Sequence, residues 1–371
     1  PAVRFELLSS TPASPTEGSG TFVALDGLAR GLGRLGHAVT VRPLGLRTGV
    51  HTLDRWLYNA RVAGAPPAAD VVVGVDLDGF LWARRRGATA ISPLGSPPGG
   101  SPRTSTPFVV MLKGIIADEL ENERGLVRAL LGLQARWERA NAARADRVIV
   151  PSRYSAAVAR EAYAIPAARL AVVPEPLDLA DWRRRFAAAA RRAADRPTVL
   201  AVARMYPRKR LEDLLEAAAI LKTRIPAVQV RIVGEGPESA RLRARHRALG
   251  LGDAAVFLGE VSRSTLAVEY VGAHCFCLPT VQEGFGLAFA EAMAAGLPVV
   301  ACRAAAVPEL VEDRRTGFLV NPRSPDELAM ALETLLTNEG LRRELGATGA
   351  RRVEALDLER VAARFLEALP R

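Results

Sequence analysis

Lysine is almost absent from this chain of 371 residues, although the chain is strongly basic. Of its 50 lysine and arginine residues, only those at positions 113, 209 and 222 are lysines. An arginine bias by itself carries no function. A lysine retained within that bias is expected where a compact ammonium group is needed in place of a forked guanidinium. Each of the three lysines is therefore a candidate functional residue.

Cysteine and histidine are also scarce, and neither forms a pattern that implies chemistry. The three cysteines, Cys275, Cys277 and Cys302, lie in apolar runs, which predicts reduced core thiols in a cytoplasmic protein. The four histidines are scattered and have no metal-ligand spacing. No uninterrupted apolar run approaches the ~20 residues of a membrane span. We therefore expect no metal site and no transmembrane helix.

Positive charge is abundant and is typical of proteins with anionic partners. The formal net charge is +10, which fits nucleic acid, an acidic membrane or a phosphorylated substrate. The arginines are spread along the chain without interleaved aromatic residues, so we expect no nucleic-acid partner. The segment FLWARRRG at 80–87 is typical of a peripheral anchor at the inner membrane face, or of an amphipathic helix with its aromatic side in the core. The second alternative is favoured.

Short apolar runs alternate with helical stretches rich in alanine, leucine and arginine. The runs span residues 3–8, 37–44, 69–75, 107–112, 146–151 and 170–174, and then 197–203, 228–234, 254–259, 274–279, 297–302 and 316–320. Continuous apolar strands separated by helices predict parallel sheets that are covered on both faces. The charged stretch 183–196 lies between the two sets and is typical of a helical connector. We predict an α/β chain of two Rossmann-like, doubly wound domains that face each other across a cleft.

Two predicted helices carry apolar residues at helical spacing, one over 211–225 and one over 124–145. On the second helix, one face holds Leu126, Leu130, Leu133 and Trp137. This pattern predicts that the face packs on the core and that the arginines of the helix lie outside.

One motif of the second half predicts an anion site. The segment EGFG at 283–286 follows a predicted strand and leads into a predicted helix over 287–295, with Gly296 as its C-terminal cap. A helix N-terminus after a glycine turn favours phosphate, because its amides are unpaired and its dipole is positive. Glu291 lies two turns into this helix and can reach another part of an extended ligand. The alternative is an ordinary turn followed by a solvated glutamate.

Two further motifs follow strands, where ligands of open parallel sheets bind. Arg204 and Lys209 follow the strand at 197–203 and can clamp a diphosphate, the arginine by its fork and the lysine as a point charge. The glycine turn GEGP at 234–237 offers backbone against which a flat base can lie. A basic loop that caps the next helix is the alternative for Arg204.

With PELVEDRRTGFLV at 308–320, these motifs resemble glycosyltransferase family 4, whose members are retaining nucleotide-sugar transferases with the GT-B fold. The resemblance implies that Arg204 and Lys209 bind the donor diphosphate and stabilise the departing nucleotide. It implies that Glu283 holds hydroxyls of the transferred sugar and that Glu291 accepts from the ribose. Further donor contacts are assigned to Gly234, Glu235, Gly236, Gly284, Phe285, Gly286 and Leu287.

The family organisation also implies where the domains lie. We expect an acceptor-side domain at 1–176, a nucleotide-sugar domain at 177–354, and a C-terminal helix, about 355–371, that packs back on the first domain. Gly18, Ser19 and Gly20 occupy the place of the family's glycine-rich loop against the donor phosphate. The alternative is a turn without a ligand.

Lys113 stands where many family members have a histidine that faces the reacting sugar. We expect Lys113 to be catalytic, through the donor phosphate or an acidic acceptor, or to pair with Asp118 or Glu119 as a structural residue. Two further departures are Glu175, in VVPEPLD, and CRAAAVPEL at 302–310, which lacks the family's glycines before PEL.

The predicted function is metal-independent transfer of a hexosyl group, with retention, from a nucleoside diphosphate sugar to an acceptor hydroxyl. Glu283, Lys113, Arg204 and Lys209 are the expected catalytic residues. We expect no cofactor, a UDP- or GDP-sugar as co-substrate, and a small-molecule, glycan or lipid-linked acceptor. The alternatives are a nucleotide-sugar epimerase or hydrolase of the same fold, and a sugar-nucleotide-binding subunit without catalysis.

Overall fold

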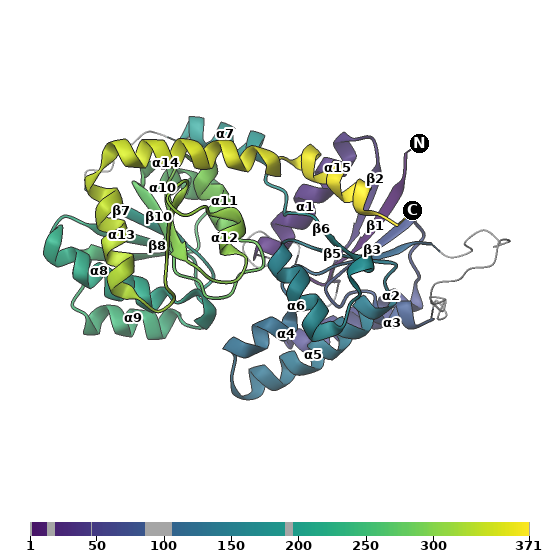
Figure 1. The fold of residues 1–371 in the computed structure, drawn as a ribbon. Helices are drawn as coiled ribbons and strands as arrows, with labels where there is room; N and C mark the ends of the chain where they lie inside the picture. Colours follow the sequence, from purple (N-terminus) through teal and green to yellow (C-terminus); the bar gives the residue numbers. More distant parts are fainter. Residues whose placement is uncertain (1, 13–18, 46, 86–105, 190–195, 371) are drawn as a thin grey trace. The chain divides into compact units, whose positions relative to one another are not determined.

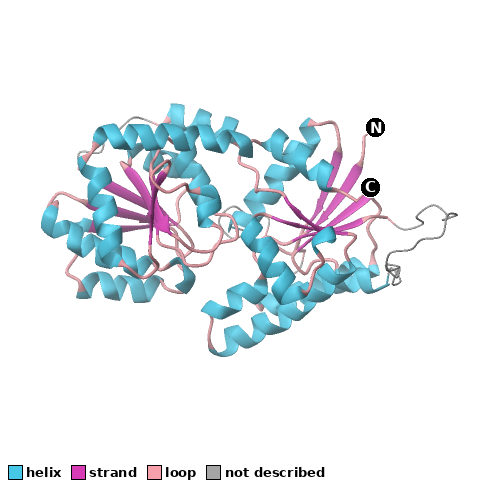
Figure 2. Cartoon of the chain, in the orientation of Figure 1, coloured by secondary structure: helices cyan, strands magenta, loops and turns pink. Residues whose placement is uncertain are grey.

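The computed structural model describes residues 2–12, 19–45, 47–85, 106–189 and 196–370. The chain divides into two compact units (Figure 1). The first unit comprises residues 1–174 and 359–371, and the second comprises residues 175–358. Each unit holds one six-stranded sheet with helices on both of its faces (Figure 2).

In the first unit, the strands are all parallel and pair in the order β2-β1-β3-β4-β5-β6. They are β1 (Arg4–Leu8), β2 (Ala38–Arg42), β3 (Val71–Val75), β4 (Phe108–Met111), β5 (Arg147–Val150) and β6 (Leu170–Val172). Strands β3 and β4 are buried along their whole length, which explains why they are apolar at every position. The order of the strands reverses between β1 and β3, so their carboxyl ends flank the switch point of this sheet.

Seven helices belong to the described part of the first unit. They are α1 (Ser19–Arg34), α2 (His51–Gly64), α3 (Phe80–Arg85), α4 (Ile116–Glu119), α5 (Gly125–Arg144), α6 (Arg153–Tyr163) and the C-terminal α15 (Leu358–Ala368). Although α15 ends the chain, it shares the core of β1. Its Phe365 lies edge-on to Phe5, with 6.0 Å between the ring centroids.

In the second unit, the strands are again parallel, in the order β12-β11-β10-β7-β8-β9. They are β7 (Thr198–Val202), β8 (Gln229–Val233), β9 (Ala255–Gly259), β10 (Cys275–Leu278), β11 (Val299–Cys302) and β12 (Gly317–Val320). The covering helices are α7 (Leu179–Ala188), α8 (Leu211–Arg224), α9 (Ser239–Ala248), α10 (Arg263–Gly272), α11 (Leu287–Ala294), α12 (Val307–Leu310), α13 (Pro325–Thr337) and α14 (Glu339–Arg352).

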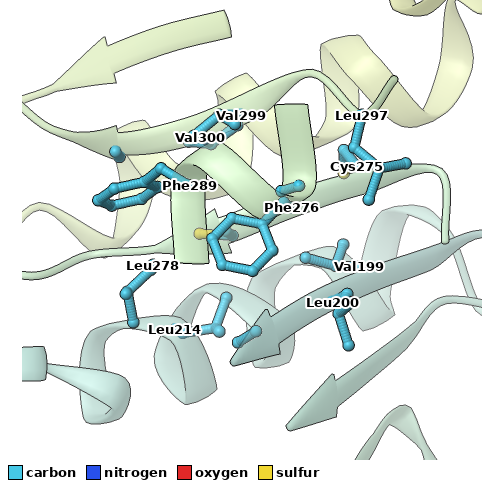
Figure 3. Packing of buried hydrophobic residues seen from close by; sticks show 14 of the residues in the cluster. Val199, Leu200, Leu214, Cys275, Phe276, Leu278, Phe289, Leu297, Val299 and Val300 are labelled. Carbon is cyan, nitrogen blue, oxygen red and sulfur yellow. The ribbon is translucent and has the colours of Figure 1, made fainter. Parts of the chain in front are cut away.

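The core of the second unit fixes α11 on the sheet. Phe289 of α11 packs edge-on against Phe276 of β10, with 5.8 Å between the ring centroids (Figure 3). Both rings are completely buried, and Val199, Leu200 and Leu214 belong to the same core. The first turn of α11 is therefore held rigidly beside the end of β10.

All twelve apolar runs predicted as strands are strands, and the predicted pair of doubly wound α/β folds is confirmed. The alternative favoured for the segment that starts at Phe80 is also confirmed as far as the described residues extend. Phe80 and Trp82 of α3 are buried, and Trp82 lies edge-on to Phe108 at 5.2 Å. The three cysteines are free and buried. None of the described helices combines the length and the apolarity of a membrane span.

The prediction for α5 is wrong in one respect. Leu126, Leu130 and Leu133 are 74%, 36% and 40% exposed, so the apolar face does not pack on the core at these three residues. Trp137 of the same predicted face does pack, and it stacks on Phe80 with 5.4 Å between the ring centroids. The buried face of α5 is instead largely polar, with Gln134 and Glu138 among its members. Apolar periodicity misplaced the three leucines because much of the inner side of this helix packs on hydrogen-bonding partners.

Candidate functional site

The switch point of the second sheet lies between β7 and β10. The chain continues from β7 to β8 and β9 on one side, and from β10 to β11 and β12 on the other. Loops 203–210 and 279–286 follow these two central strands, and a parallel sheet brings both loops to the same edge. The predicted motifs with Arg204, Lys209 and Glu283 therefore meet at one place.

An ion pair joins the two loops. The Lys209 ammonium lies 2.5 Å from Glu283 Oε2, and the two side chains are only 13% and 18% exposed. The Val281 amide also donates to the Arg208 carbonyl at 2.9 Å. The resemblance assigns this lysine and this glutamate to two parts of one ligand, and the two side chains contact each other directly.

Arg204 and the aromatic ring of Tyr206 share the loop after β7. The Arg204 guanidinium carbon lies 5.8 Å from the Tyr206 ring centroid, and that of Arg208 lies 4.7 Å from it. Two arginines of this loop thus lie near one tyrosine ring. The loop presents a positive surface at the carboxyl end of β7.

The glycine turn before α11 is required by packing. Gly286 has φ +97, and a Cβ there would lie 2.5 Å from the Phe289 ring. Its carbonyl accepts from the Phe289 amide at 3.0 Å, which starts the helix. The predicted C-terminal cap is confirmed, since Gly296 has φ +78 and donates to the Met293 carbonyl at 2.9 Å. The N-terminus of α11 therefore opens beside Glu283 with its first amides directed outward.

The GEGP turn is shaped by contacts within the protein. A Cβ on Gly234 would lie 2.1 Å from the Ala203 carbonyl oxygen, and one on Gly236 would lie 2.6 Å from the Met205 nitrogen. Glu235 is held by Ser239 Oγ at 2.5 Å and by Arg243 at 2.8 Å, and these hydrogen bonds lower its pKa. The two glycines thus bring this turn against the loop that carries Arg204.

Glu291 is tied to a buried tyrosine. The Tyr270 hydroxyl donates to Glu291 Oε2 at 2.9 Å, from a ring that is completely buried. Burial raises the pKa of Glu291 to about 7, partly offset by this hydrogen bond and by the charge of Arg263. Glu291 is therefore not the solvated helix residue of the alternative interpretation. Its second oxygen can accept from a ligand.

The segment 302–310, which lacks the family's glycines before PEL, has a left-handed backbone at one alanine. Ala305 has φ +50, which is in the left-handed region that costs a residue with a Cβ about 1 kcal/mol. The next amide, that of Ala306, donates to the Glu283 carbonyl at 3.2 Å. The strained alanine thus lies beside the backbone contact that positions Glu283.

In the first unit, the predicted phosphate loop lies partly outside the residues that the structure describes. Gly18 lies outside the described residues, while Ser19 and Gly20 begin α1. Lys113 follows β4 as predicted, and its backbone amide donates to Asp76 Oδ1 at 2.8 Å. Lys113 therefore lies next to a carboxylate that the sequence analysis did not single out.

The switch point of the first sheet holds a buried polar cluster. Asp78 is completely buried and accepts from the Ser10 amide at 2.6 Å and the Ser10 hydroxyl at 2.8 Å. Arg55 lies 3.7 Å from Asp76 and donates to Ser10 Oγ at 3.2 Å. Asp76 has φ +54, and burial raises its pKa to about 6. The signal that sequence reasoning missed is the pair of aspartates directly after the buried strand β3.

Two residues of α5 complete this cluster. The Asn141 side-chain amide donates to the carbonyls of Asp76 and Asp78, at 2.9 Å and 3.0 Å. Glu138 Oε2 accepts from the Ile116 amide at 2.9 Å and from the Tyr163 hydroxyl. Burial raises the pKa of Glu138 well above its ordinary value. The strained turn at Asp76 is thus held by α5. Among the described residues, no group of three or more His, Cys, Asp or Glu side chains is placed to hold a metal ion.

Two family models match the chain. The model described as Glycosyltransferase Family 4 matches residues 18–181, and the model described as Glycosyl transferases group 1 matches residues 183–352. Together they leave only the two ends of the chain and one residue between them unmatched.

Curated relatives are similar over part of the chain. The GDP-mannose-dependent alpha-(1-6)-phosphatidylinositol monomannoside mannosyltransferase of Mycobacterium tuberculosis is 33% identical over 189 residues, which cover 49% of this chain and 48% of the relative. The D-inositol 3-phosphate glycosyltransferase of Geodermatophilus obscurus is 35% identical over 224 residues, covering 57% and 49%. The matched region spans about half the length of these relatives.

Solved structures share the fold. The sucrose-phosphate synthase of Thermosynechococcus elongatus has a TM-score of 0.78 at 23% identity, over 98% of this chain and 97% of its own. WaaG, a glycosyltransferase involved in lipopolysaccharide biosynthesis, has a TM-score of 0.73 at 17% identity, over 99% of each chain. HepE of Anabaena, in complex with UDP and glucose, has a TM-score of 0.71 at 19% identity, over 98% of each chain.

The strain at Ala305 predicts a stabilising substitution. We expect Ala305→Gly to raise the free energy of unfolding of the second unit by about 1 kcal/mol, because glycine adopts the left-handed region without a Cβ penalty. The matched control is Ala304→Gly, next to it at a position without positive φ, where added backbone entropy should lower stability. Urea denaturation measures both. A loss of stability in Ala305→Gly equal to that of the control would contradict the expectation.

The raised pKa of Glu291 predicts a pH-dependent difference in stability. Ionising a carboxyl whose folded-state pKa is about 7, against an ordinary 4.5, destabilises the folded state. This loss of stability is absent below the ordinary pKa of 4.5 and complete above the folded-state pKa of about 7. Glu291→Gln removes this titration, so its free energy of unfolding should rise relative to the parent from about pH 5 to about pH 8.

The control for this measurement is Glu235→Gln, because hydrogen bonds lower the pKa of Glu235. Its difference from the parent should stay constant between about pH 5 and about pH 8 and change only in more acidic solution. A pH-independent difference for Glu291→Gln, from denaturation curves at about pH 5 and about pH 8, would contradict the raised pKa of Glu291.

Proposed function

The chain belongs to glycosyltransferase family 4 and has the GT-B fold, and on this premise we propose that it transfers a hexosyl group from a nucleoside diphosphate sugar to an acceptor hydroxyl, with retention at the sugar carbon. The observation that carries the proposal is the contact of Lys209 with Glu283 beside the N-terminus of α11. A strong cation, a carboxylate and a helix N-terminus meet at the switch point, where a doubly wound sheet binds its ligand.

The positive groups bind the diphosphate in this proposal. Arg204 and Lys209 come from the loop after β7, and the first amides of α11 come from the loop after β10. As the bond between the sugar and the diphosphate breaks, negative charge grows on the leaving phosphate. Preorganised positive groups lower that barrier, because they need no reorganisation when the charge develops. We therefore propose that the reaction is metal-independent and needs no cofactor.

The ion pair implies an exchange of partners when the donor binds. The Lys209 ammonium lies 2.5 Å from Glu283 Oε2. A diphosphate competes for the same ammonium, and its arrival releases Glu283 to accept from the hydroxyls of the transferred sugar. We propose that Glu283 is thereby available to the sugar only when the diphosphate is in place. Glu291 binds the ribose hydroxyls through the oxygen that does not accept from Tyr270.

The transfer step follows a front-side route. The bond from the anomeric carbon to the diphosphate oxygen breaks while the acceptor oxygen attacks from the same face. The acceptor proton passes to the leaving diphosphate oxygen, which acts as the base, so the electron pair of the broken bond ends on the nucleotide. Retention then requires no second carboxylate, and none is assigned.

Donor and acceptor are assigned only as classes. The relatives are named for GDP-mannose and for D-inositol 3-phosphate, and a structural neighbour was solved with UDP and glucose. We propose a UDP- or GDP-hexose as donor, bound by residues 177–354, and a polyol, glycan or lipid-linked alcohol as acceptor, bound by residues 1–176 with the helix at about 355–371. The three buried free thiols support a cytoplasmic site of action.

The exchange of partners predicts opposite effects of two substitutions on donor binding. Glu283→Gln removes the carboxylate that competes for Lys209, so this variant should bind UDP or GDP at least as tightly as the parent. Its transfer rate should fall about a hundredfold or more. Lys209→Ala should weaken nucleotide binding about tenfold or more, because a charge-assisted contact is lost. Thermal stabilisation by UDP-, GDP- and ADP-sugars and a radiolabelled transfer assay measure the two properties.

Lys222→Ala is the matched control. Lys222 is exposed, its ammonium donates to the Gly250 carbonyl at 2.8 Å, and it is not one of the proposed ligand contacts. It should change neither property. If no nucleotide stabilises the parent protein, the donor site is wrong. Release of free or epimerised sugar without an acceptor would identify a hydrolase or epimerase, and donor binding without transfer to a broad acceptor panel would identify a non-catalytic subunit.

Lys113 provides a separate test of the first unit. We propose that Lys113 acts on the reacting groups and does not contribute to donor affinity. The charged residues that are proposed to contact the donor all belong to the second unit. Lys113→Ala should lower transfer far more than nucleotide binding, and Lys113→Arg should not restore transfer. Full transfer by the arginine variant would make Lys113 a structural residue of the loop that pairs with Asp76 through its backbone.

A further inference from the structure

Two buried carboxyl groups hold the segment that carries Lys113. This segment, residues 112–115, connects β4 to α4. The Lys113 amide donates to Asp76 Oδ1 at 2.8 Å. Directly after the segment, the Ile116 amide donates to Glu138 Oε2 at 2.9 Å. One carboxyl group belongs to the turn after β3 and the other to α5, so two separate elements fix the course of the segment.

Three buried carboxyl groups share the guanidinium group of Arg55. Asp76, Asp78 and Glu138 are 9%, 0% and 0% exposed. Arg55 is buried as well, and its charge acts on all three carboxyl groups. A buried charge without a partner is so costly that the group takes up a proton instead. We therefore expect at least one of the three carboxyl groups to be neutral.

The hydrogen bonds indicate which carboxyl group is neutral. Both oxygens of Asp78 accept from Ser10, one from its amide at 2.6 Å and one from its hydroxyl at 2.8 Å. Donors on both oxygens favour an ionised carboxylate. Glu138 differs, because the Ile116 amide and the Tyr163 hydroxyl both donate to the same oxygen, Oε2. Its other oxygen, Oε1, can therefore carry a proton.

A second buried oxygen on α5 needs a donor. Among the described residues, neither Glu138 Oε1 nor Asn141 Oδ1 has a hydrogen-bonding partner, although both atoms are buried. The two residues are three apart on one helix, where side chains are neighbours. Two buried acceptors that meet no donor are costly, whereas a proton on Glu138 Oε1 turns one of them into a donor for the other. A single proton thus satisfies both oxygens.

This hydrogen bond connects the two ends of the Lys113 segment. The Asn141 side-chain nitrogen donates to the carbonyls of Asp76 and Asp78, at 2.9 Å and 3.0 Å. Asp76 in turn accepts from the Lys113 amide. Glu138, Asn141 and Asp76 therefore form one chain of contacts through the interior, and helices α4, α5 and α6 contact one another around it (Figure 1).

The charges around Glu138 favour its neutral form. Burial raises the pKa of Glu138 well above its ordinary value, and the charge of Asp76 acts in the same direction. The hydrogen bonds from Tyr163 and Ile116 and the charge of Arg55 oppose this shift without cancelling it.

Asp76 is the more easily ionised of the two groups. Burial raises the pKa of Asp76 to about 6, and the charges of Asp78 and Glu119 act in the same direction. The charge of Arg55 and the hydrogen bond from the Lys113 amide oppose the shift. The geometry thus combines a carboxylate at one end of the segment with a carboxylic acid at the other.

We propose that Glu138 is a neutral carboxylic acid at neutral pH, that its Oε1 hydroxyl donates to Asn141 Oδ1, and that Glu138 and Asp76 are positioning residues for the transfer step. The first two statements are independent of the activity, while the third rests on the proposed function. Ionisation of Glu138 releases its proton to water, leaves two acceptors facing each other and adds a negative charge beside Asp76. Both attachments of the Lys113 segment then weaken.

The first experiment measures the proton on Glu138 through stability. Glu138→Gln imitates the neutral acid, because its oxygen accepts from Ile116 and Tyr163 and its nitrogen donates to Asn141. In the parent, the unfolded chain ionises Glu138 above about pH 4.5 while the folded chain keeps it neutral. The unfolding equilibrium constant of the parent should therefore rise relative to that of the variant, about tenfold per pH unit from about pH 5.5 to about pH 7.5.

Urea denaturation of the full chain at each pH gives these constants. The matched control is Glu161→Gln, which changes an exposed glutamate of α6 in the same unit. It should keep the pH dependence of the parent. Equal pH dependence of the parent and Glu138→Gln overturns the neutral acid.

Infrared spectroscopy detects the proton directly. The difference spectrum between the parent and Glu138→Gln should contain the carbonyl band of a protonated carboxyl group, which the variant lacks. Asn141→Ser should shift this band, because the Glu138 hydroxyl loses its partner. Carboxylate bands in the difference spectrum overturn the neutral acid. An unshifted band in Asn141→Ser overturns the hydrogen bond to Asn141 and assigns the proton to a buried water instead.

Transfer assays test the positioning role. Glu138→Ala should lower the transfer rate about tenfold or more, Glu138→Gln should recover most of that loss, and thermal stabilisation by UDP or GDP should be the same in both. The transfer rate of the parent should fall below about pH 6, where Asp76 takes up a proton. Asp76→Asn should lack this fall, because its side-chain oxygen accepts from the Lys113 amide at every pH.

The outcomes separate the proposals. Equal transfer by Glu138→Ala and Glu138→Gln, or an acidic fall that persists in Asp76→Asn, overturns the positioning role and leaves the neutral acid in place. If Glu138→Ala does not fold, the pH profile of Asp76→Asn decides alone. A parent that shows the stability difference but no hexosyl transfer overturns the proposed function, and with it the positioning role.

Discussion

Parallel pairing of the strands is the constraint from which the rest of the structure follows. A parallel neighbour can be reached only by a crossover, so each helix returns the chain to the amino edge, and the loops that follow the strands collect at the carboxyl edge. Each sheet then has one switch point, between β1 and β3 in the first unit and between β7 and β10 in the second. Polar side chains bond to one another at both places, Asp78 to Ser10 in the first unit and Lys209 to Glu283 in the second.

In the second unit, backbone packing rather than side-chain attraction holds the site in position. Gly236 and Gly286 admit the close approach of Met205 and Phe289, which no residue with a Cβ would allow. The contact of Lys209 with Glu283 is then made between two loops that are already fixed. A pair of partly exposed ions adds little stability on its own. In the proposed function, each of the two ions exchanges its partner when an anion enters.

In the first unit, the usual relation between a helix and its core is reversed. Asp76 has a left-handed backbone directly after β3, and its turn is stabilised by the amide of Asn141. Meeting that demand requires polar residues on the inner side of α5, and Leu126, Leu130 and Leu133 are left outside. The same physical cause thus produces a rigid polar switch point and an apolar outer surface.

The sequence by itself determined the twelve strands and the pairing of glycine turns with helix starts, and it singled out Lys209 and Glu283 as candidates, because apolar runs, glycines and rare lysines are local signals. It did not determine that these two side chains contact each other, because they are 74 residues apart. Nor did it identify Asp76 and Asp78, whose partners lie on α2, α5 and the loop after β1. The orientation of α5 was decided only by the tertiary structure. Apolar periodicity marks the inner face of a helix when burial is driven by the hydrophobic effect, and here hydrogen bonds to a strained turn decided it instead.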